Sequence, residues 1–367
     1  MIYLDSAATT KMDKRVIDVM NESFENDFAN PSSLHSLGFQ VEKKMRKSRE
    51  AIANQLGVLP DNIFFVPSAT IANNAVVNSV GVKSGQNVVL SKVEHSSMQR
   101  ISENFDGEFR YVGVCGKCFV DIEELLELVD DNTVLVSIIH VNNEIGSIND
   151  IEEISRRVKE KNPNVLVHSD GVQAFKKIDI SLKNIDFYTV AGHKINGPKG
   201  IAALYVKNPN KFTSLYFGGG QEKGLFSSTE NTYGIFGIGE AAKLDNNYEK
   251  IVELNKYLRE EIVKIEGVKI ISPEENVSPF ILSVHVENIG SEVLLHYLEM
   301  DGIFLSSGSA CSKGKASRVL KAIGLSDEQA KGVIRISFDR NSNKEQVDIF
   351  LEKLKEKIEI IRGILKR

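Results

Sequence analysis

Apolar and polar positions alternate along the first half of the chain in blocks that predict a repeated strand–helix order. Short runs rich in β-branched and aromatic residues are followed by longer stretches with helical periodicity. The predicted strands lie at residues 62–66, 88–90, 133–140, 165–170, 185–190 and 201–206. This alternation is typical of a mainly parallel sheet with crossover helices, so we predict an α/β fold.

The pattern changes after residue 206. A polar, glycine-rich segment at 218–231 predicts a flexible loop outside the core, and helical periodicity from about 239 to 265 predicts a long connecting helix. Apolar runs at 278–286, 293–300, 303–305 and 333–338 then indicate a smaller α+β domain. We predict a large domain over residues 13–250 and a small domain formed by residues 1–12 and 251–367.

Composition narrows the class of protein. The 367 residues are 42% hydrophobic and 26% charged, as in ordinary globular proteins, and the net charge of −5 offers no basic footprint for nucleic acid or an anionic membrane. No apolar run is long enough to span a bilayer, and the N-terminus lacks the basic region of a signal peptide. The three cysteines argue against a disulfide scaffold, so we expect a reducing, cytoplasmic location.

Chemically versatile side chains follow the predicted strands, and parallel sheets bind ligands at the carboxyl ends of their strands. The residues at or just after these ends are Thr70, His95, Asn143, Asp170, Gln173 and Lys194. Lys194 follows a buried strand and precedes a glycine–proline loop, where desolvation favours Schiff-base chemistry. Each residue also has a plain structural interpretation, such as a solvated lysine in a turn, but their convergence favours a ligand site.

A second indication comes from the strand-to-helix turn at Ser68, Ala69 and Thr70. The first turn of a helix presents unpaired backbone N–H groups and a positive dipole end, which suit an anion. The alternative is a simple N-cap by Ser68 or Thr70.

The predicted small domain carries two further candidates. Cys311 lies in a segment of small, polar and cationic residues, where it is either a reactive thiolate or a spare surface thiol. Arg335 lies in an apolar strand and needs an anionic partner, either a substrate carboxylate or a structural acid. Cys115 and Cys118 lie at the tip of a predicted hairpin over 110–120, where a lone C-x-x-C favours a plain turn over a metal or redox site. No metal site is expected.

Taken in order, these motifs resemble those of class V, fold-type I pyridoxal-phosphate (PLP) enzymes, and among them the NifS/IscS-type cysteine desulfurases. The resemblance runs essentially from end to end. The segments that carry it are 4–10, 30–33, 68–74, 94–95, 142–146, 170–173, 192–200, 218–222, 306–311 and 335–337.

The resemblance implies a role for each residue of the cofactor site. Lys194 is expected to form the Schiff base with PLP and to move the α-proton, Asp170 to pair with the pyridinium nitrogen, and His95 to stack on the ring. Gln173 and Asn143 are expected to bind the phenolic oxygen. The phosphate is expected to be held by four residues at two loops: Ser68, Ala69, Thr70 and His193.

The resemblance also implies the substrate side and the partners. Arg335, Asn143 and Ala8 are expected to contact L-cysteine, whose sulfur passes to Cys311 as a persulfide while L-alanine is released. Thr229 is expected to reach the phosphate of a second subunit, which implies a homodimer, and a protein acceptor is expected to take the sulfur. The alternatives are a selenocysteine lyase on the same scaffold and a non-catalytic sulfur-relay or partner-binding protein.

The chain departs from the family pattern around the expected phosphate site. Ala191 replaces a serine before the Gly-His-Lys motif, and Phe226 and Ser228 replace the arginine and glycine of an Arg-Ser-Gly-Thr motif. A missing phosphate hydroxyl is worth about 1 kcal/mol of cofactor binding. The pattern therefore predicts a weakened phosphate grip, which Ala191→Ser is expected to strengthen.

Overall fold

The computed structural model describes residues 1–116, 118–214, 216–308 and 317–365. Within these ranges a seven-stranded sheet has the order β2-β8-β7-β6-β5-β3-β4. Its strands are β2 Ile63–Val66, β3 Asn87–Ser91, β4 Glu108–Val112, β5 Thr133–Ser137, β6 Leu166–Asp170, β7 Phe187–Ala191 and β8 Ala202–Val206. Strands β3 to β7 pair in parallel, whereas β8 is antiparallel to both neighbours. This large, mostly parallel sheet confirms the predicted fold class.

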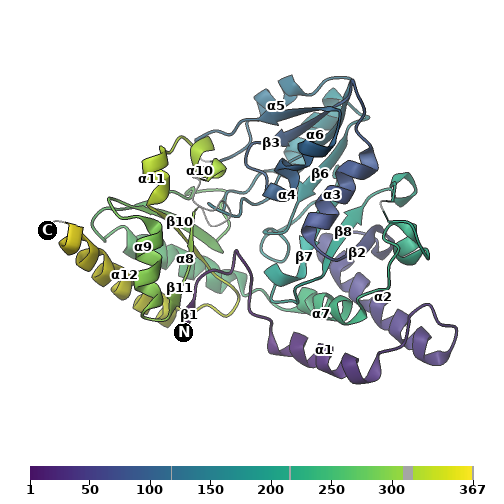
Figure 1. Cartoon of the computed structure of the whole chain (residues 1–367), viewed down its shortest axis with the longest axis horizontal. Helices are drawn as coiled ribbons and strands as arrows, with labels where there is room; N and C mark the ends of the chain where they lie inside the picture. Colours follow the sequence, from purple (N-terminus) through teal and green to yellow (C-terminus); the bar gives the residue numbers. More distant parts are fainter. Residues whose placement is uncertain (117, 215, 309–316, 366–367) are drawn as a thin grey trace.

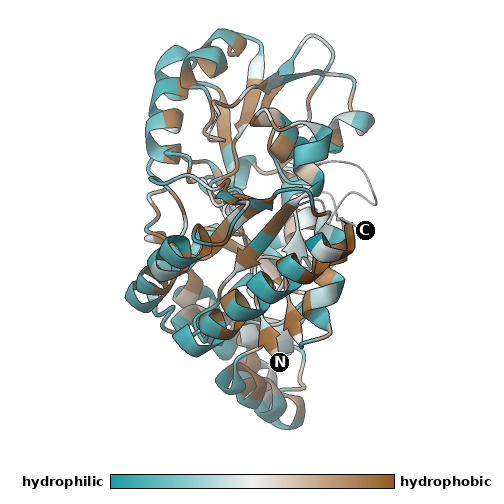
Figure 2. Cartoon of the chain, turned by 90° about the vertical axis from the view of Figure 1, so that its left-hand side faces the viewer, coloured by the Kyte–Doolittle hydropathy of each residue, from teal (hydrophilic) through white to brown (hydrophobic). Residues whose placement is uncertain are grey.

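Most strands of this sheet are buried along their whole length, because helices cover both of its faces. These helices are α1 Lys14–Asn26, α2 Ser36–Leu56, α3 Ala69–Val80, α4 Ser96–Gln99, α5 Ile122–Leu128, α6 Ile151–Lys161 and α7 Thr232–Lys243. One apolar cluster joins the sheet to α2, α5, α6 and α7, and another joins it to α3. Figure 2 shows apolar strands inside and polar outer helix faces.

A second sheet has the order β12-β13-β10-β9 and is antiparallel throughout. Its strands are β9 Val268–Ile270, β10 Ile281–Val286, β12 Ser306–Ser307 and β13 Val333–Ser337. It shares a core with α8 Tyr248–Ile262, α9 Ser291–Glu299 and α12 Lys344–Leu365. The short helices α10 Arg318–Ala322 and α11 Asp327–Lys331 precede β13.

The start of the chain joins this second sheet rather than the first. Strand β1 Ile2–Tyr3 pairs in parallel with β11 Ile303–Phe304, and Leu4 O accepts a 2.7 Å hydrogen bond from Ser337 N. Figure 1 shows the N-terminus beside β11 and α12, two elements that come from the C-terminal part of the chain. The predicted domain boundary near residue 250 stays a prediction.

Two expectations from the sequence are wrong in detail. The helix predicted over 239–265 is broken between α7 and α8, where Leu244 is buried and Asn247 takes a left-handed φ of 53°. The segment 218–231 is not wholly outside the core, because Leu225 and Phe226 are buried and pack beneath α3. Among the helices of the described chain, none is both long and apolar enough to cross a membrane.

Candidate active site

The predicted site residues gather at one edge of the seven-stranded sheet. Strands β3, β5, β6 and β7 are parallel, and two antiparallel pairings give β2 the same direction as β7. The carboxyl ends of these strands therefore share an edge. Asp170 is the last residue of β6, and Lys194 closes the short helix η3 Gly192–Lys194 that follows β7.

A chain of hydrogen bonds links Asp170 to His95. Asn73 Nδ2 donates to Asp170 Oδ2 and to Ser97 Oγ, both at 2.9 Å, and Ser97 Oγ lies 2.9 Å from His95 Nδ1. The Asp170 carboxylate also accepts from Val172 N at 3.0 Å. Asn73 is fully buried in α3. Asn73 belongs to segment 68–74, which carries the family resemblance, but the sequence alone predicted no role for it.

Burial sets the protonation of the neighbouring groups. Burial lowers the pKa of His95, Asp170 opposes this shift, and the Lys194 charge adds to it to a smaller extent, so the neutral ring is favoured at physiological pH. Burial and then Asp170 raise the pKa of Glu94 well above its usual range.

The N-terminal segment crosses directly over Lys194. Lys194 Nζ donates to Ala7 O at 2.6 Å and to Ala8 O at 2.7 Å, and Gln173 Nε2 donates to Ala7 O at 2.8 Å. The predicted contact residue Ala8 therefore meets the predicted catalytic lysine through its backbone. Docking of Leu4 on β13 holds this segment in place.

His193 is held by the same N-terminal segment. Its Nδ1 lies 3.2 Å from the Thr9 hydroxyl, and its carbonyl accepts a 2.9 Å hydrogen bond from Thr10 Oγ1. Burial and then the charge of Lys194 lower the pKa of His193 to about 4. His193 is therefore neutral and can act toward an anion only as a hydrogen-bond donor.

Ser68, Ala69 and Thr70 form the start of α3, as predicted. The Ser68 side chain caps the helix by accepting from Ile71 N at 3.3 Å. The N-cap interpretation of Ser68 is thus correct. It is compatible with an anion site, because the first N–H groups of a helix have no partner within it.

Arg335 joins the two sheets. It lies in β13 and is 5% exposed, and its guanidinium donates to Asn143 O and to Asp5 Oδ1, both at 2.9 Å. A structural acid, Asp5, therefore partners Arg335. Its Nε is also buried and has no hydrogen-bond partner among the described residues, so a further donor remains for an incoming carboxylate.

Residues 2–350 match the family model described as Aminotransferase class-V. The chain belongs to this family. It is 36% identical over 371 residues to the cysteine desulfurase IscS of Clostridium botulinum (strain Hall), covering 96% of this chain and 93% of that relative. It is 34% identical over 379 residues to the cysteine desulfurase IscS of Dictyoglomus turgidum, covering 99% and 96%. These matches confirm the resemblance drawn from the motifs.

Solved structures of similar proteins have the same fold as this chain. A NifS-like protein superposes with a TM-score of 0.91 at 34% identity, covering 98% of this chain and 99% of the other. A NifS-like protein from Rickettsia africae gives 0.88 at 32%, covering 97% and 99%. A structure described as SspA in complex with cysteine gives 0.82 at 30%, covering 94% and 100%.

Two predicted residues are not placed with the class-V site. Thr229 is exposed in the segment after the short helix η5 Gln221–Gly224, and its predicted role toward a second subunit stays a prediction. Cys311 lies outside the described residues.

Glu144 is a residue that the sequence prediction left without a role. Its carboxyl accepts a hydrogen bond from Ser317 Oγ at 2.5 Å, and Ser317 caps the start of α10. Burial raises the pKa of Glu144 to about 7, although Ser317, Arg335 and Arg318 oppose the shift. Glu144 thus connects the strand-end segment of Asn143 to the chain just beyond residue 316.

The two main departures from the family pattern share one environment. Ala191 is 2% exposed and Phe226 is 5% exposed, and both belong to the apolar cluster beneath α3. Phe226 also packs near the rings of Phe212 and Tyr216, at 6.5 and 5.8 Å between centroids. Apolar side chains therefore stand together where the family pattern has a hydroxyl and a cation.

The C-x-x-C segment forms a turn. Val114 and Val120 make a β-bridge, and Cys118 N donates to Cys115 O at 2.8 Å, as expected for the predicted hairpin tip. Cys115 is exposed, whereas Cys118 is buried and its thiol pKa is raised to about 12 by burial. Cys118 is therefore a poor nucleophile at neutral pH.

Proposed function

We propose that the protein is a PLP-dependent cysteine desulfurase that converts L-cysteine to L-alanine and passes the sulfur to an acceptor. The observation that carries the proposal is the meeting of Lys194, Asp170 and His95 at one sheet edge, with Arg335 nearby on the second sheet. Family membership and full-length cysteine desulfurase relatives support it.

Class-V enzymes are PLP-dependent in general, and the donor set fits this cofactor. Asp170 offers a carboxylate to the ring nitrogen, His95 a neutral aromatic ring, and the start of α3 a set of N–H groups for a phosphate. The Asn73 hydrogen bond fixes the Asp170 carboxylate. Bound PLP would supply an electron sink for the pair left when a bond at the substrate Cα breaks.

Lys194 is the residue we assign to the cofactor and to proton transfer. Its ammonium group donates to the carbonyls of Ala7 and Ala8. These carbonyls would hold the amine whenever the cofactor does not engage it. That position keeps Lys194 available to take the α-proton and return a proton to the product.

Arg335 is the residue we assign to the substrate carboxylate. It already donates to Asp5 and Asn143 O, and its Nε is a further donor without a partner among the described residues. A carboxylate bound there would be oriented by the fork of the guanidinium. We place the Asn143 side chain on the substrate or cofactor oxygen in the same space.

The sulfur step requires Cys311. Its thiolate attacks the substrate sulfur, so that an S–S bond forms while the substrate Cβ–S bond breaks. The electron pair of that bond stays with Cβ, which takes a proton to become the methyl group of alanine. One cysteine and one Cys311 thiol thus give alanine and one persulfide, and no external oxidant or reductant is needed.

The test is alanine release by the Cys311→Ala variant, with Cys115→Ala as a matched control because Cys115 is exposed and lies in the hairpin turn. We expect Cys311→Ala to lose activity on L-cysteine and Cys115→Ala to keep it. If Cys311→Ala and wild type both act well on L-selenocysteine while wild type uses L-cysteine poorly, the protein is a selenocysteine lyase. Absence of cofactor binding would support a non-catalytic relay protein.

We further propose a homodimer in which Thr229 reaches the partner's phosphate site. A groove of about 570 Å³ lies between α2 and the segment around Thr229, with Pro31, Glu222 and Glu230 in its lining. Large apolar side chains are exposed in the connection between α1 and α2, on α2 and just before the glycine-rich segment: Phe28, Leu34, Phe39 and Phe217. Sedimentation analysis should give a dimer.

A further inference from the structure

A second lysine, Lys177, lies close to Lys194, and Lys177 has no ion-pair partner among the described residues. Lys177 is only 5% exposed, and its Nζ lies 5.8 Å from the centre of the Phe280 ring. Among the described residues no carboxylate lies within ion-pair distance of it, although many other lysines have such a partner. Burying an ammonium group without a counter-ion is costly, so Lys177 must serve a purpose other than stability.

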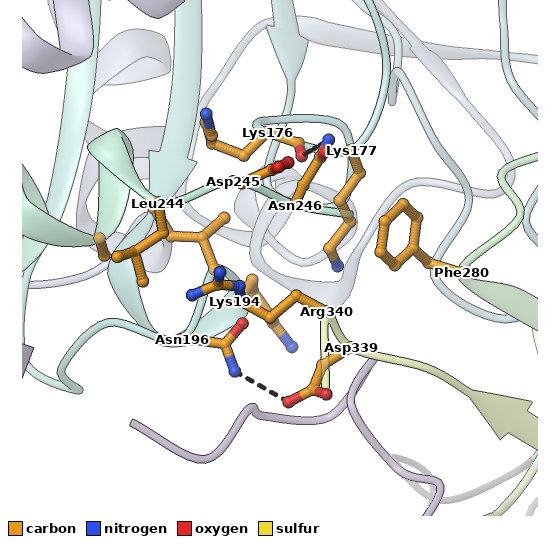
Figure 3. Close-up of a pocket in the computed structure, with 12 residues that line it drawn as sticks. Lys176, Lys177, Lys194, Asn196, Leu244, Asp245, Asn246, Phe280, Asp339 and Arg340 are labelled. Carbon is orange, nitrogen blue, oxygen red and sulfur yellow. Dashed lines mark hydrogen bonds between the residues drawn. The ribbon is translucent and has the colours of Figure 1, made fainter. Parts of the chain in front are cut away.

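The hydrogen bonds of Lys177 lead to Lys194. Lys177 Nζ donates to Gln173 Oε1 at 3.0 Å, one turn earlier in the chain, and Gln173 Nε2 donates to Ala7 O at 2.8 Å. Lys194 Nζ donates to the same carbonyl at 2.6 Å. Figure 3 shows Lys177 and Lys194 in one pocket, with Phe280 beside Lys177.

In its protonated form Lys177 can only donate hydrogen bonds, and its bond to Gln173 Oε1 is the contact that the protonated form requires. The Gln173 amide must therefore turn its oxygen toward Lys177 and its NH₂ group toward Ala7 and the site. With Lys177 removed, only the Ala7 carbonyl still distinguishes the two ends of the amide, so rotation that presents oxygen to the site becomes less costly. An oxygen there would repel the phenolic oxygen of the cofactor, whereas the NH₂ group would bind it.

We propose that Lys177 is a positioning residue that fixes the amide of Gln173 for the cofactor and holds positive charge beneath Lys194. This inference rests on the proposed function, because the cofactor is the group that Gln173 would meet. Burial, followed by the charge of Lys194, lowers the pKa of Lys177 to about 7. The other charged groups that face it are Asp339, which opposes this shift, and Arg335, which adds to it.

The test compares Lys177→Met with Lys176→Met. Both variants remove a lysine from neighbouring positions that line the same pocket, but Lys176 Nζ binds Gln55 Oε1 and not Gln173. We expect Lys177→Met to lose PLP on dialysis about tenfold faster than wild type. Its visible cofactor absorbance should titrate with an apparent pKa higher by ~0.5–1 unit, because a like charge near Lys194 is gone. Lys176→Met should match wild type in both measurements.

The melting temperature of the cofactor-free protein separates positioning from a structural role. Because Lys177 is a buried charge without a counter-ion, Lys177→Met should leave this temperature unchanged or raise it. A variant that melts lower and also titrates like wild type would overturn the proposal, as would unchanged cofactor retention. Lys177→Arg should restore part of the retention, since it keeps both donor and charge.

A double-mutant cycle tests whether Lys177 acts through Gln173. Gln173→Ala and Lys177→Met should together speed cofactor loss no more than Gln173→Ala alone. Additive effects would contradict the positioning route. If wild type itself binds no PLP, the proposed function fails, and this outcome is distinct from failure of the Lys177 inference in a protein that binds the cofactor.

Discussion

Replacing Arg335 by lysine should raise the KM for the amino-acid substrate far more than it lowers kcat. Arg335 is 5% exposed, and two of its nitrogens donate at 2.9 Å to Asp5 and Asn143 O while its Nε has no partner among the described residues. A carboxylate bound by such a fork gains two charge-assisted hydrogen bonds. Lysine keeps the charge but not the planar fork.

The size of the effect follows from the lost hydrogen bond. A hydrogen bond to a charged group contributes about 1.5–3 kcal/mol, and 1.4 kcal/mol corresponds to a tenfold change in affinity. The KM of Arg335→Lys should therefore rise roughly 10- to 150-fold. The carboxylate binds in the ground state as well as in the transition state, so kcat should fall much less.

Arg110→Lys is the matched control, measured by the same alanine-release assay. Arg110 also lies on a strand, and it donates to the carboxylate of Asp130 and to the carbonyl of Leu128, far from the site on the edge strand β4. Its KM should equal that of wild type. An unchanged KM for Arg335→Lys would refute the assignment and leave Arg335 as the structural partner of Asp5.

Three further predictions concern the cofactor and the pH dependence of stability. Ala191→Ser should slow PLP loss on dialysis by up to about fivefold, and no change would mean that other groups already hold the phosphate. Asp170→Asn should lower kcat by a factor of about 100 or more with the fold retained by circular dichroism, because an amide cannot keep the ring nitrogen protonated. The Glu144 pKa of about 7 lies above its unfolded value, so its charge destabilises the fold increasingly as pH rises from 4.5 to 7. Glu144→Gln should therefore stabilise the protein at pH 8, by about 1–2 kcal/mol, and hardly at pH 5.

The strand pattern and the shared sheet edge were predictable because they depend on local sequence. Buried runs of β-branched residues end at polar side chains, and parallel strands bring those ends together. This placed Asp170 and Lys194 in one site. The antiparallel direction of β8 follows from the short glycine–proline connection after Lys194, which leaves no room for a crossover helix.

Other parts of the site depend on tertiary burial and could not be read from local pattern. Asn73 lies in α3 and Lys177 in a turn after β6, both of which are compatible with exposure, and only the packing of distant segments buries them. The burial of Phe226 within a polar segment has the same origin, because its partners Phe212 and Tyr216 are contributed by other loops. The break between α7 and α8 depends on the backbone of Asn247.

The identity of the lysine that carries the cofactor is the central claim. Borohydride reduction of the protein loaded with PLP, followed by digestion and peptide mass mapping, fixes the cofactor covalently to the lysine that holds it. We predict that the added mass is on Lys194 and is absent from the Lys194→Ala variant. Modification of Lys177 or Lys199 instead, with Lys194 unmodified, would contradict the account.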